Sequence, residues 1–351
     1  IYDRNGVLLA DNRPSYVLSL VVERVPDLDA TVADLRELVP VSEQDVEKFL
    51  ARKGRRRPYE PVPLHYRLTE SERASLAVNR YRLPGVVVDA QLLRHYPEGE
   101  LFSHALGYVG RINEREQAEI DEVAYRGTNH IGKLGIEKFY EDILHGRVGY
   151  QNVETNALGR VLRVLEKSPP GPGVDLTLSL DSRVQRAAYD ALGERRGAVV
   201  AIDPADGSVL ALVSTPGFDT NQFVNGISSA NYAALRDSPN LPLFNRAIQG
   251  QYPPGSTVKP IIGLAGLHYG FITPESTVSD PGWFRLPGGK RRFRDWTLRV
   301  RGGGHGSAVD LYQAIEESCD VYFYDLAHRM GVDRIHDFSA PFGLGDRTGI
   351  D

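Results

Sequence analysis

Apolar residues in the first third of the chain follow two alternating patterns. Short apolar runs, such as residues 16–22 and 86–88, are separated by charged stretches, such as 41–50 and 69–79, whose apolar positions recur at helical spacing. Runs of the first kind are typical of strands, and stretches of the second kind are typical of helices that cover a sheet. We therefore expect an α+β fold.

A proline- and glycine-rich stretch divides the chain. Before it, residues 135–145 carry apolar side chains at helical spacing and are followed by Gly146, which predicts a helix that ends at a glycine. Residues 168–173 read Ser-Pro-Pro-Gly-Pro-Gly, which can continue neither a helix nor a central strand. We place the domain boundary there, so that residues 1–170 and 171–351 form two domains.

The pattern after this boundary predicts strand, helix, hairpin and then further helices. Residues 174–180 alternate like a strand, and Ser182 is placed to cap a helix that runs through Leu192. Residues 198–203 and 208–214 flank the turn sequence Pro-Ala-Asp-Gly and predict a hairpin. This order predicts an antiparallel sheet covered by helices.

Composition excludes several function classes. The 351 residues have a net charge of −5, so no basic field indicates nucleic-acid binding, and we interpret the basic cluster 52–57 as a solvated loop. The single cysteine, Cys319, excludes an internal disulfide framework. No window approaches the roughly 18–20 apolar residues that span a bilayer. The chain begins at Ile1, so an anchor upstream of it stays possible.

Ser256-Thr257-Val258-Lys259 fits the Ser-x-x-Lys pattern, in which a lysine replaces histidine as the base for a nucleophilic serine. About one or two chance matches are expected in a chain of this length, so the context decides. A Tyr-Pro-Pro-Gly turn precedes Ser256, and an apolar stretch through residue 267 follows it, which places Ser256 at the start of a helix. Lys259 then lies on the same face, and the helix end offers N–H groups to a developing oxyanion.

Residues 249–260, Gln-Gly-Gln-Tyr-Pro-Pro-Gly-Ser-Thr-Val-Lys-Pro, resemble class B penicillin-binding proteins, and among them the elongation-specific transpeptidases of rod-shaped bacteria. Residues 3–6, 132–137, 280–283 and 316–320 are similar to the same family in the same order. The resemblance implies an N-terminal non-catalytic pedestal, of the dimerisation type, and a transpeptidase domain of the β-lactamase-like class. It also implies attachment to the periplasmic face of the bacterial inner membrane through an anchor upstream of this chain, and no organic cofactor.

The family resemblance assigns two further residues to the site. Ser318 takes the place of the second-motif serine, and Asp320 stands where asparagine is usual, although this subfamily is similar in using aspartate. From the residues alone, Asp320 is equally a cap of the helix 321–330. The third family motif, Lys-Thr/Ser-Gly, is missing, and Arg347-Thr348-Gly349 resembles it only superficially. We expect the motif downstream of this chain, so carboxylate binding and half of the oxyanion hole are in doubt for these residues alone.

A structural zinc ion beside the serine is a further hypothesis, with Asp280, Asp295, His305 and Cys319 as its ligands. Carboxylate, imidazole and thiolate groups form a tetrahedral zinc set, and four protein ligands would leave no open position for hydrolysis. Some members of the resembled subfamily have this set. The spacing matches no compact zinc motif, and the alternative is a buried packing cysteine, a loop histidine and turn-capping aspartates.

Three functions follow from these features. The first is a D,D-transpeptidase that cross-links peptidoglycan stem peptides ending in D-Ala-D-Ala and is acylated by β-lactams. The second, a D,D-carboxypeptidase or β-lactamase, would pass the acyl group to water, and penicillin turnover separates it from the first. The third is a sensor or scaffold that is acylated without turnover. By resemblance, the partners of the pedestal include the lipid-linked glycan polymerase and the scaffold of the elongation machinery.

Overall fold

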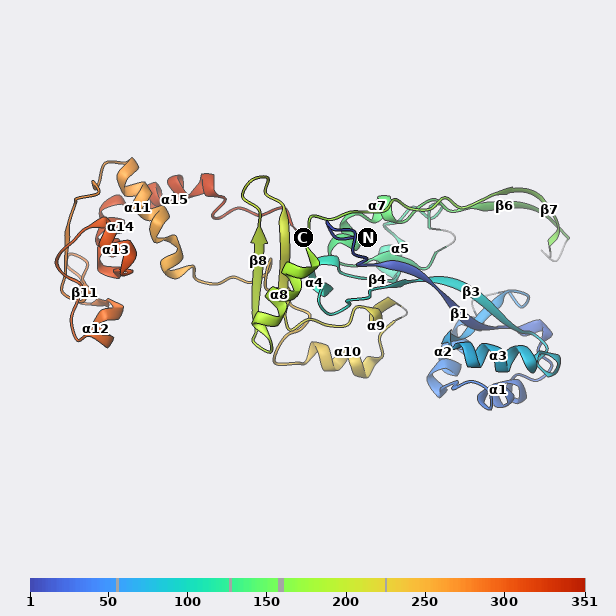
Figure 1. The fold of residues 1–351 in the computed structure, drawn as a ribbon. Helices are drawn as coiled ribbons and strands as arrows, with labels where there is room; N and C mark the ends of the chain where they lie inside the picture. Colours follow the sequence, from blue (N-terminus) through green and yellow to red (C-terminus); the bar gives the residue numbers. More distant parts are fainter. Residues whose placement is uncertain (55–56, 126–127, 157–160, 225, 351) are drawn as a thin grey trace. The chain divides into compact units, whose positions relative to one another are not determined.

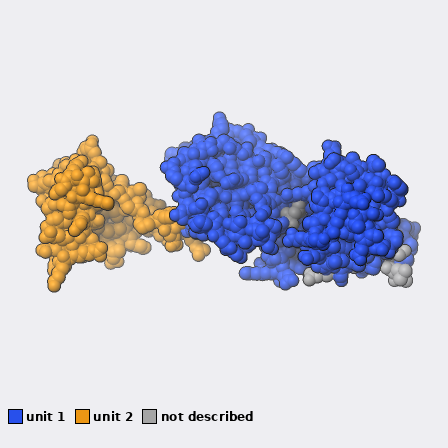
Figure 2. All heavy atoms as spheres, turned by 90° about the horizontal axis from the view of Figure 1, so that it is seen from below, with its two compact units in different colours: residues 1–249, 351 blue, residues 250–350 orange. Residues whose placement is uncertain are grey.

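The computed structural model describes residues 1–350 except 55–56, 126–127, 157–160 and 225, and Figure 1 traces its ribbon. Two compact units make up the chain, residues 1–249 and residues 250–350, which Figure 2 colours separately. None of the helices that the structure describes has the length and hydropathy of a membrane-spanning segment. The predicted basic loop, residues 52–57, lies partly outside the described residues.

The first unit begins with a three-stranded antiparallel sheet in the order β2-β1-β3. Its strands are β1 (Asp11–Val21), β2 (Pro61–Leu68) and β3 (Val86–His95), so the predicted apolar runs 16–22 and 86–88 fall on β1 and β3. Three helices accompany the sheet: α1 (Leu28–Arg36), α2 (Glu43–Lys53) and α3 (Glu70–Val78). Capping boxes at Ser42 and Thr69 start α2 and α3, which confirms the two predicted helical stretches. Short 3-10 turns follow β1 and α3, at Val22–Arg24 and Arg80–Arg82.

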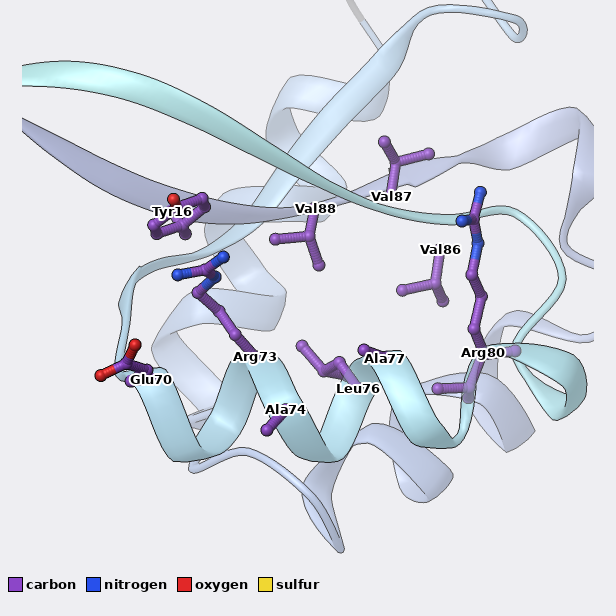
Figure 3. Close-up of a pocket in the computed structure, with 11 residues that line it drawn as sticks. Tyr16, Glu70, Arg73, Ala74, Leu76, Ala77, Arg80, Val86, Val87 and Val88 are labelled. Carbon is purple, nitrogen blue, oxygen red and sulfur yellow. The ribbon is translucent and has the colours of Figure 1, made fainter.

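The core of this sheet and its helices is aliphatic. Its most deeply buried members come from β1, β2 and the helices: Leu18, Leu20, Leu35, Phe49 and Leu64. Beside this core, a groove of about 450 Å³ opens between α3 and β3 (Figure 3). Arg73 of α3 places its guanidinium carbon 3.4 Å from the centre of the Tyr16 ring, and Val86 and Val88 line the groove from the strand. The groove is therefore lined by apolar side chains together with the charged residues Glu70, Arg73 and Arg80.

The rest of the pedestal region consists of short elements. They are α4 (Ser103–Leu106), β4 (Val109–Arg111), α5 (Glu114–Gln117), β5 (His130–Gly132), α6 (Gly135–Phe139), α7 (Glu141–Leu144), β6 (Tyr150–Thr155) and β7 (Val161–Ser168). The single helix predicted over 135–145 is wrong, because α6 and α7 separate at Tyr140. Different tertiary contacts hold the two turns: the Glu137 carboxylate accepts hydrogen bonds from Arg94 and Tyr96, whereas that of Glu141 accepts the Gly132 N–H.

The strand predicted over 174–180 is also wrong. This segment is extended, but it makes only an isolated bridge, between Tyr2 and Thr177, among the described residues. Several of its backbone bonds go to the start of the chain, where the Tyr2 N–H donates to Leu176 O at 2.8 Å and Tyr2 O accepts from the Leu178 N–H at 2.9 Å. The pairing does not continue into a ladder, because the Asp181 N–H donates to Leu210 O rather than to the start of the chain. The domain boundary at residue 170 stays a prediction, and residues 1–10 contact the segment that follows it.

A helix and a hairpin follow, as predicted. They are α8 (Ser182–Leu192), β8 (Gly197–Ile202) and β9 (Val209–Thr215), and two short helices come next, α9 (Asn221–Val224) and α10 (Ser229–Arg236). α8 packs against β9, and the buried Gln185 side chain exchanges two hydrogen bonds with the Leu212 backbone. The cap of α8 is Asp181 rather than Ser182, because the Asp181 carboxylate accepts the Arg183 N–H.

The second unit is built around α14 (Asp320–Met330), whose buried face includes Tyr322, Leu326 and Met330. The preceding helices are η3 (Gly255–Val258), α11 (Lys259–His268), α12 (Trp296–Val300) and α13 (Leu311–Glu316), and α15 (Val332–Ser339) and η4 (Ala340–Phe342) follow. Two small antiparallel pairs complete it: β10 (Val278–Asp280) with β13 (Gly306–Val309), and β11 (Trp283–Phe284) with β12 (Phe293–Arg294). The core joins α11, α13 and α14.

Candidate active site and adjacent metal-binding cluster

Ser256 lies in the 3-10 turn η3, which leads directly into α11. Gly255 precedes it with a φ of 59°, a left-handed conformation that glycine adopts without strain. Ser256 is exposed, whereas Lys259, the first residue of α11, is only 8% exposed. Pro260 is tolerated beside it because the first turn of a helix leaves its N–H groups without intrahelical partners. The sequence therefore presents the hydroxyl to solvent and buries the amine next to it.

Ser318 directly follows the C-cap residue of α13, at the position where a helix usually has a glycine. The Cys319 N–H bonds to Ala314 O at 2.9 Å and the Ser318 N–H bonds to Ile315 O at 3.3 Å, which is the hydrogen-bond pattern of a Schellman motif at the end of α13. The motif requires a left-handed residue, and Ser318 has a φ of 55°. A serine here is strained, and the conformation persists because surrounding contacts hold it.

The four predicted catalytic residues meet at this point. The Ser318 hydroxyl donates to Ser256 Oγ at 2.9 Å. Lys259 Nζ donates to Ser318 O at 2.8 Å, to Ser318 Oγ at 3.1 Å and to Asp320 Oδ1 at 2.6 Å. Lys259 Nζ also lies 5.6 Å from the centre of the Phe323 ring. An exposed hydroxyl is thus connected through a second hydroxyl to a buried amine, an arrangement able to move a proton away from an attacking serine.

The four predicted metal ligands also come together. One donor atom from each of Asp280, Asp295, His305 and Cys319 lies within 4.8 Å of every other. His305 Nδ1 is 2.7 Å from Asp280 Oδ2 and 3.7 Å from Asp295 Oδ1, and Cys319 Sγ is 3.4 Å from Asp280 Oδ2. The His305, Asp280 and Asp295 side chains are fully buried. Tetrahedral zinc with its usual bond lengths separates its ligand atoms by about 3.3–3.8 Å, so this cluster has suitable dimensions.

Backbone hydrogen bonds orient these ligands. Asp280 accepts the N–H groups of Gly282 and His305. Burial alone would raise the pKa of Asp295, but hydrogen bonds from Thr297, and from the N–H groups that begin α14, hold that pKa below its usual value. Burial, together with the nearby Asp280 carboxylate, raises the pKa of the Cys319 thiol to about 12.

The cluster adjoins the serine site through the backbone of residues 319–321. Asp295 Oδ2 accepts the Asp320 N–H at 2.7 Å and the Val321 N–H at 3.3 Å. The helix cap is Cys319, whose sulfur accepts the Tyr322 N–H, so the alternative in which Asp320 caps this helix is wrong. Asp320 is instead the first residue of α14, and its carboxylate is left to pair with Lys259.

Glu317 and Trp296 are two neighbours that the sequence patterns did not single out. Trp296 Nε1 donates to Glu317 O at 3.1 Å, and Arg301 Nη1 donates to the Glu317 carboxylate at 3.0 Å. Hydrogen bonds from Gln313 and Arg301 lower the pKa of Glu317. The available signal was position: Glu317 immediately precedes the motif serine. By contrast, Arg347-Thr348-Gly349 is exposed and lies in no helix or strand.

Two family models match the chain. Residues 1–178 match the penicillin-binding protein dimerisation domain, and residues 197–351 match the penicillin-binding protein transpeptidase domain. Curated relatives include peptidoglycan D,D-transpeptidase MrdA of Acinetobacter baumannii, 47% identical over 100% of this chain and 52% of the relative, and that of Escherichia coli K12, 44% identical over 100% and 55%. The chain therefore spans about half the length of the curated relatives it matches.

Solved structures are similar over nearly the whole chain. Pseudomonas aeruginosa PBP2, in complex with WCK 5153, is 40% identical with a TM-score of 0.68, covering 99% of this chain and 57% of that one. Helicobacter pylori PBP2, in a complex with MreC, is 31% identical with a TM-score of 0.83, covering 99% and 64%. These likenesses confirm the predicted two-domain architecture of pedestal and transpeptidase-type domain.

Proposed function

Because this chain belongs to the penicillin-binding proteins, we propose that it carries the pedestal and the nucleophile-bearing part of a peptidoglycan D,D-transpeptidase that acts during cell elongation. The observation that most directly supports this proposal is the series of hydrogen bonds that joins Ser256 through Ser318 to Lys259. Supporting it, the A. baumannii and E. coli relatives bear the name D,D-transpeptidase.

In the proposed reaction, Ser256 Oγ attacks the carbonyl carbon of the penultimate D-Ala of a stem peptide. Lys259 takes the hydroxyl proton, directly or through Ser318, after its ammonium group, which donates three hydrogen bonds in the resting site, has passed one proton to the Asp320 carboxylate. The C–N bond breaks, terminal D-Ala leaves after its nitrogen takes up a proton, and an ester remains on Ser256. An amine of a neighbouring stem peptide then attacks this ester, which restores the serine and forms the cross-link. A β-lactam would form the corresponding ester when its ring opens.

The test is covalent labelling of the full natural protein with a fluorescent penicillin. We expect one label per molecule, mapped by mass spectrometry to the peptide that contains Ser256. Ser256→Ala should abolish the label, and Lys259→Ala should slow labelling by about 10²–10⁴-fold, as expected for loss of a general base. Lys290→Ala, which changes an exposed lysine of the same unit, is the matched control. Labelling that survives Ser256→Ala would refute the mechanism.

The fate of the acyl group separates the alternative functions. A transpeptidase passes the acyl group of a stem peptide to an amine and releases bound penicillin slowly. Rapid penicillin turnover would instead indicate a β-lactamase, and hydrolysis of stem peptides without cross-linking would indicate a carboxypeptidase. Acylation with neither reaction would indicate a sensor or scaffold. Incubation with a pentapeptide substrate and an amine acceptor, followed by chromatography of the products, distinguishes all of these.

We propose that the protein acts at the periplasmic face of the inner membrane and that its pedestal contacts a scaffold protein and a lipid-linked glycan polymerase. The H. pylori relative forms a complex with MreC, which supports a scaffold of that kind. The groove between α3 and β3 is a candidate surface for it. Ala77→Trp would fill the groove from an exposed position of α3, and Ala33→Trp on α1 is the control. Equal affinity of both variants for the scaffold, measured by calorimetry, would place the contact elsewhere.

We also propose that Asp280, Asp295, His305 and Cys319 hold one structural zinc ion. Two buried carboxylates, an imidazole nitrogen and a thiol converge there, with one donor atom from each within 4.8 Å of every other. A divalent cation at their centre would compensate the charge of the two carboxylates. All four positions are protein ligands, so the ion would stabilise the fold rather than activate water.

Metal analysis tests the zinc site. We expect about one equivalent of zinc in the purified protein and a large loss in Cys319→Ser, because a hydroxyl is a poor substitute for a thiolate. Less than about a tenth of an equivalent in the unsubstituted protein, unchanged after zinc is added, would refute the site.

A further inference from the structure

The Glu317 residue is held from several directions. Its carbonyl oxygen receives the Trp296 indole N–H at 3.1 Å and lies 3.3 Å from His305 Nε2. Its carboxylate accepts from Arg301 at 3.0 Å and from Gln313 at 3.1 Å. A helix leaves its last carbonyl groups without intrahelical partners, and here a side chain from α12 satisfies one of them. Both polar groups of Glu317 are therefore fixed.

Trp296 itself is well placed to act on this carbonyl. Its ring meets the His305 ring edge to face, with centres 5.9 Å apart, and the Arg301 guanidinium carbon lies 5.4 Å from its centre. Trp296 is 41% exposed, so it contributes less to the core than a buried tryptophan would. Its N–H bond to Glu317 is thus its principal polar contact with the motif.

The next residue explains why such restraint matters. Ser318 has a φ of 55°, and a serine adopts this left-handed conformation at a cost that glycine does not have. From this conformation, its hydroxyl reaches Ser256 and its carbonyl oxygen reaches Lys259 Nζ at 2.8 Å. A relaxed Ser318 backbone would move both groups. Glycine would relieve the strain, but it has no hydroxyl to reach Ser256. Contacts from neighbouring residues must therefore hold Ser318 in this conformation.

We propose that Trp296 and Glu317 are positioning residues that hold Ser318 in its left-handed conformation, and so keep Ser256 and Lys259 connected. This inference rests on the acylation proposed above and deepens it. Asp295 restrains the other side of the motif through the N–H groups of residues 320–321. Trp296 acts on the preceding side, through one carbonyl that adjoins the strained residue.

The first measurement is the second-order rate of acylation of the full natural protein by a fluorescent penicillin. Trp296→Phe keeps an aromatic ring and removes the N–H donor, and we expect acylation to slow about tenfold. The loss should appear in the acylation step rather than in initial binding, because the N–H does not contact the ligand. Trp283→Phe is the matched control, since Trp283 makes a ring contact with Arg292 and no hydrogen bond to the 317–320 segment among the described residues. We expect it to acylate at the unsubstituted rate.

Measuring Trp296→Phe in two further variants, Ser318→Gly and Ser318→Ala, tests whether Trp296 acts through the conformation of residue 318. Ser318→Gly and Ser318→Ala both lose the hydroxyl, so their residual acylation is slow and is followed over long incubations. Glycine adopts the left-handed conformation unaided, whereas alanine resists it as serine does. Adding Trp296→Phe should therefore change the rate less than twofold in the glycine background. In the alanine background it should slow acylation about tenfold, as it does with serine.

Each outcome decides the matter. The proposal would be overturned if Trp296→Phe slowed acylation equally in the Ser318→Gly and Ser318→Ala backgrounds, or if it did not slow acylation when residue 318 is serine. It would also be overturned if zinc loss, measured in the same samples, accounted for the slower acylation. If Trp296→Phe folds poorly, Arg301→Gln, at a side chain that is 55% exposed, supplies the same test with an expected slowing of about threefold. Absence of labelling in the unsubstituted protein would instead refute the proposed function. Labelling with no effect of either variant would refute this inference alone.

Discussion

Asp3 connects the start of the chain to α8, and replacing it with asparagine should destabilise the first unit measurably. Its carboxylate accepts four hydrogen bonds: from the N–H groups of Asn5 and Val7, both at 2.8 Å, and from the N–H and hydroxyl of Ser182, at 3.0 and 2.7 Å. Burial alone would raise the pKa of Asp3, but these bonds, led by that of the Ser182 N–H, lower it to about 2.

The magnitude follows from this pKa. A carboxyl group has a pKa of about 3.9 in an unfolded chain, so the folded state favours the charged form by about 2–3 kcal/mol. The amide of an asparagine can replace one acceptor oxygen, but its NH₂ would face the Ser182 donors. We therefore expect Asp3→Asn to lose about 2–3 kcal/mol at pH 7, or about 4–12 °C in Tm for a unit of this size.

The stabilisation by Asp3 should decrease as the pH falls. Because the folded pKa is depressed, the stabilisation by Asp3 is complete above about pH 4 and is lost as the pH falls toward 2. The difference in Tm between the unsubstituted protein and Asp3→Asn should shrink over that interval. Calorimetry at fixed pH values measures it, with Asp190→Asn at an exposed position of α8 as the control. A difference that is absent at pH 7, or constant down to pH 2.5, would contradict the reasoning.

Three further predictions concern the fold and the metal cluster. Gly132→Ala should strongly lower the yield and the Tm of folded protein, because its Cβ would lie 2.1 Å from Glu137 O, whereas Gly54→Ala, with no atom within 4 Å of its Cβ, should not. Tyr96→Phe should cost about 1–3 kcal/mol, since it removes a buried hydroxyl that donates to Glu137, and Tyr81→Phe at an 85% exposed ring should leave the urea midpoint unchanged. A strong chelator should slow penicillin acylation and lower the Tm of the second unit, and addition of zinc should restore both; identical curves with and without chelator would count against a metal.

Sequence patterns predicted the elements that depend on neighbouring residues. The hairpin β8–β9 follows from local turn chemistry and the helices α2 and α3 follow from apolar residues at helical spacing, and the structure confirms them. The predicted helix over 135–145 failed because Glu137 and Glu141 bond to residues distant in sequence, which no periodicity records. The predicted strand over 174–180 failed because the segment pairs with the start of the chain only at the Tyr2–Thr177 bridge among the described residues, and alternation does not record how far a pairing extends.

The candidate site shows the same division. By itself, the sequence determined which chemistry is available at the serine, because Ser-x-x-Lys places a hydroxyl and an amine three residues apart, whereas the spacing of Asp280, Asp295, His305 and Cys319 left a metal site and a packing role both open. Only the tertiary structure decided that Ser318, which is 62 residues from Ser256, joins hydroxyl to amine, and that its backbone is left-handed. The physical reason is that sequence patterns report interactions within one turn or strand. Long-range hydrogen bonds, and the strain they maintain, depend on how the packed helices meet.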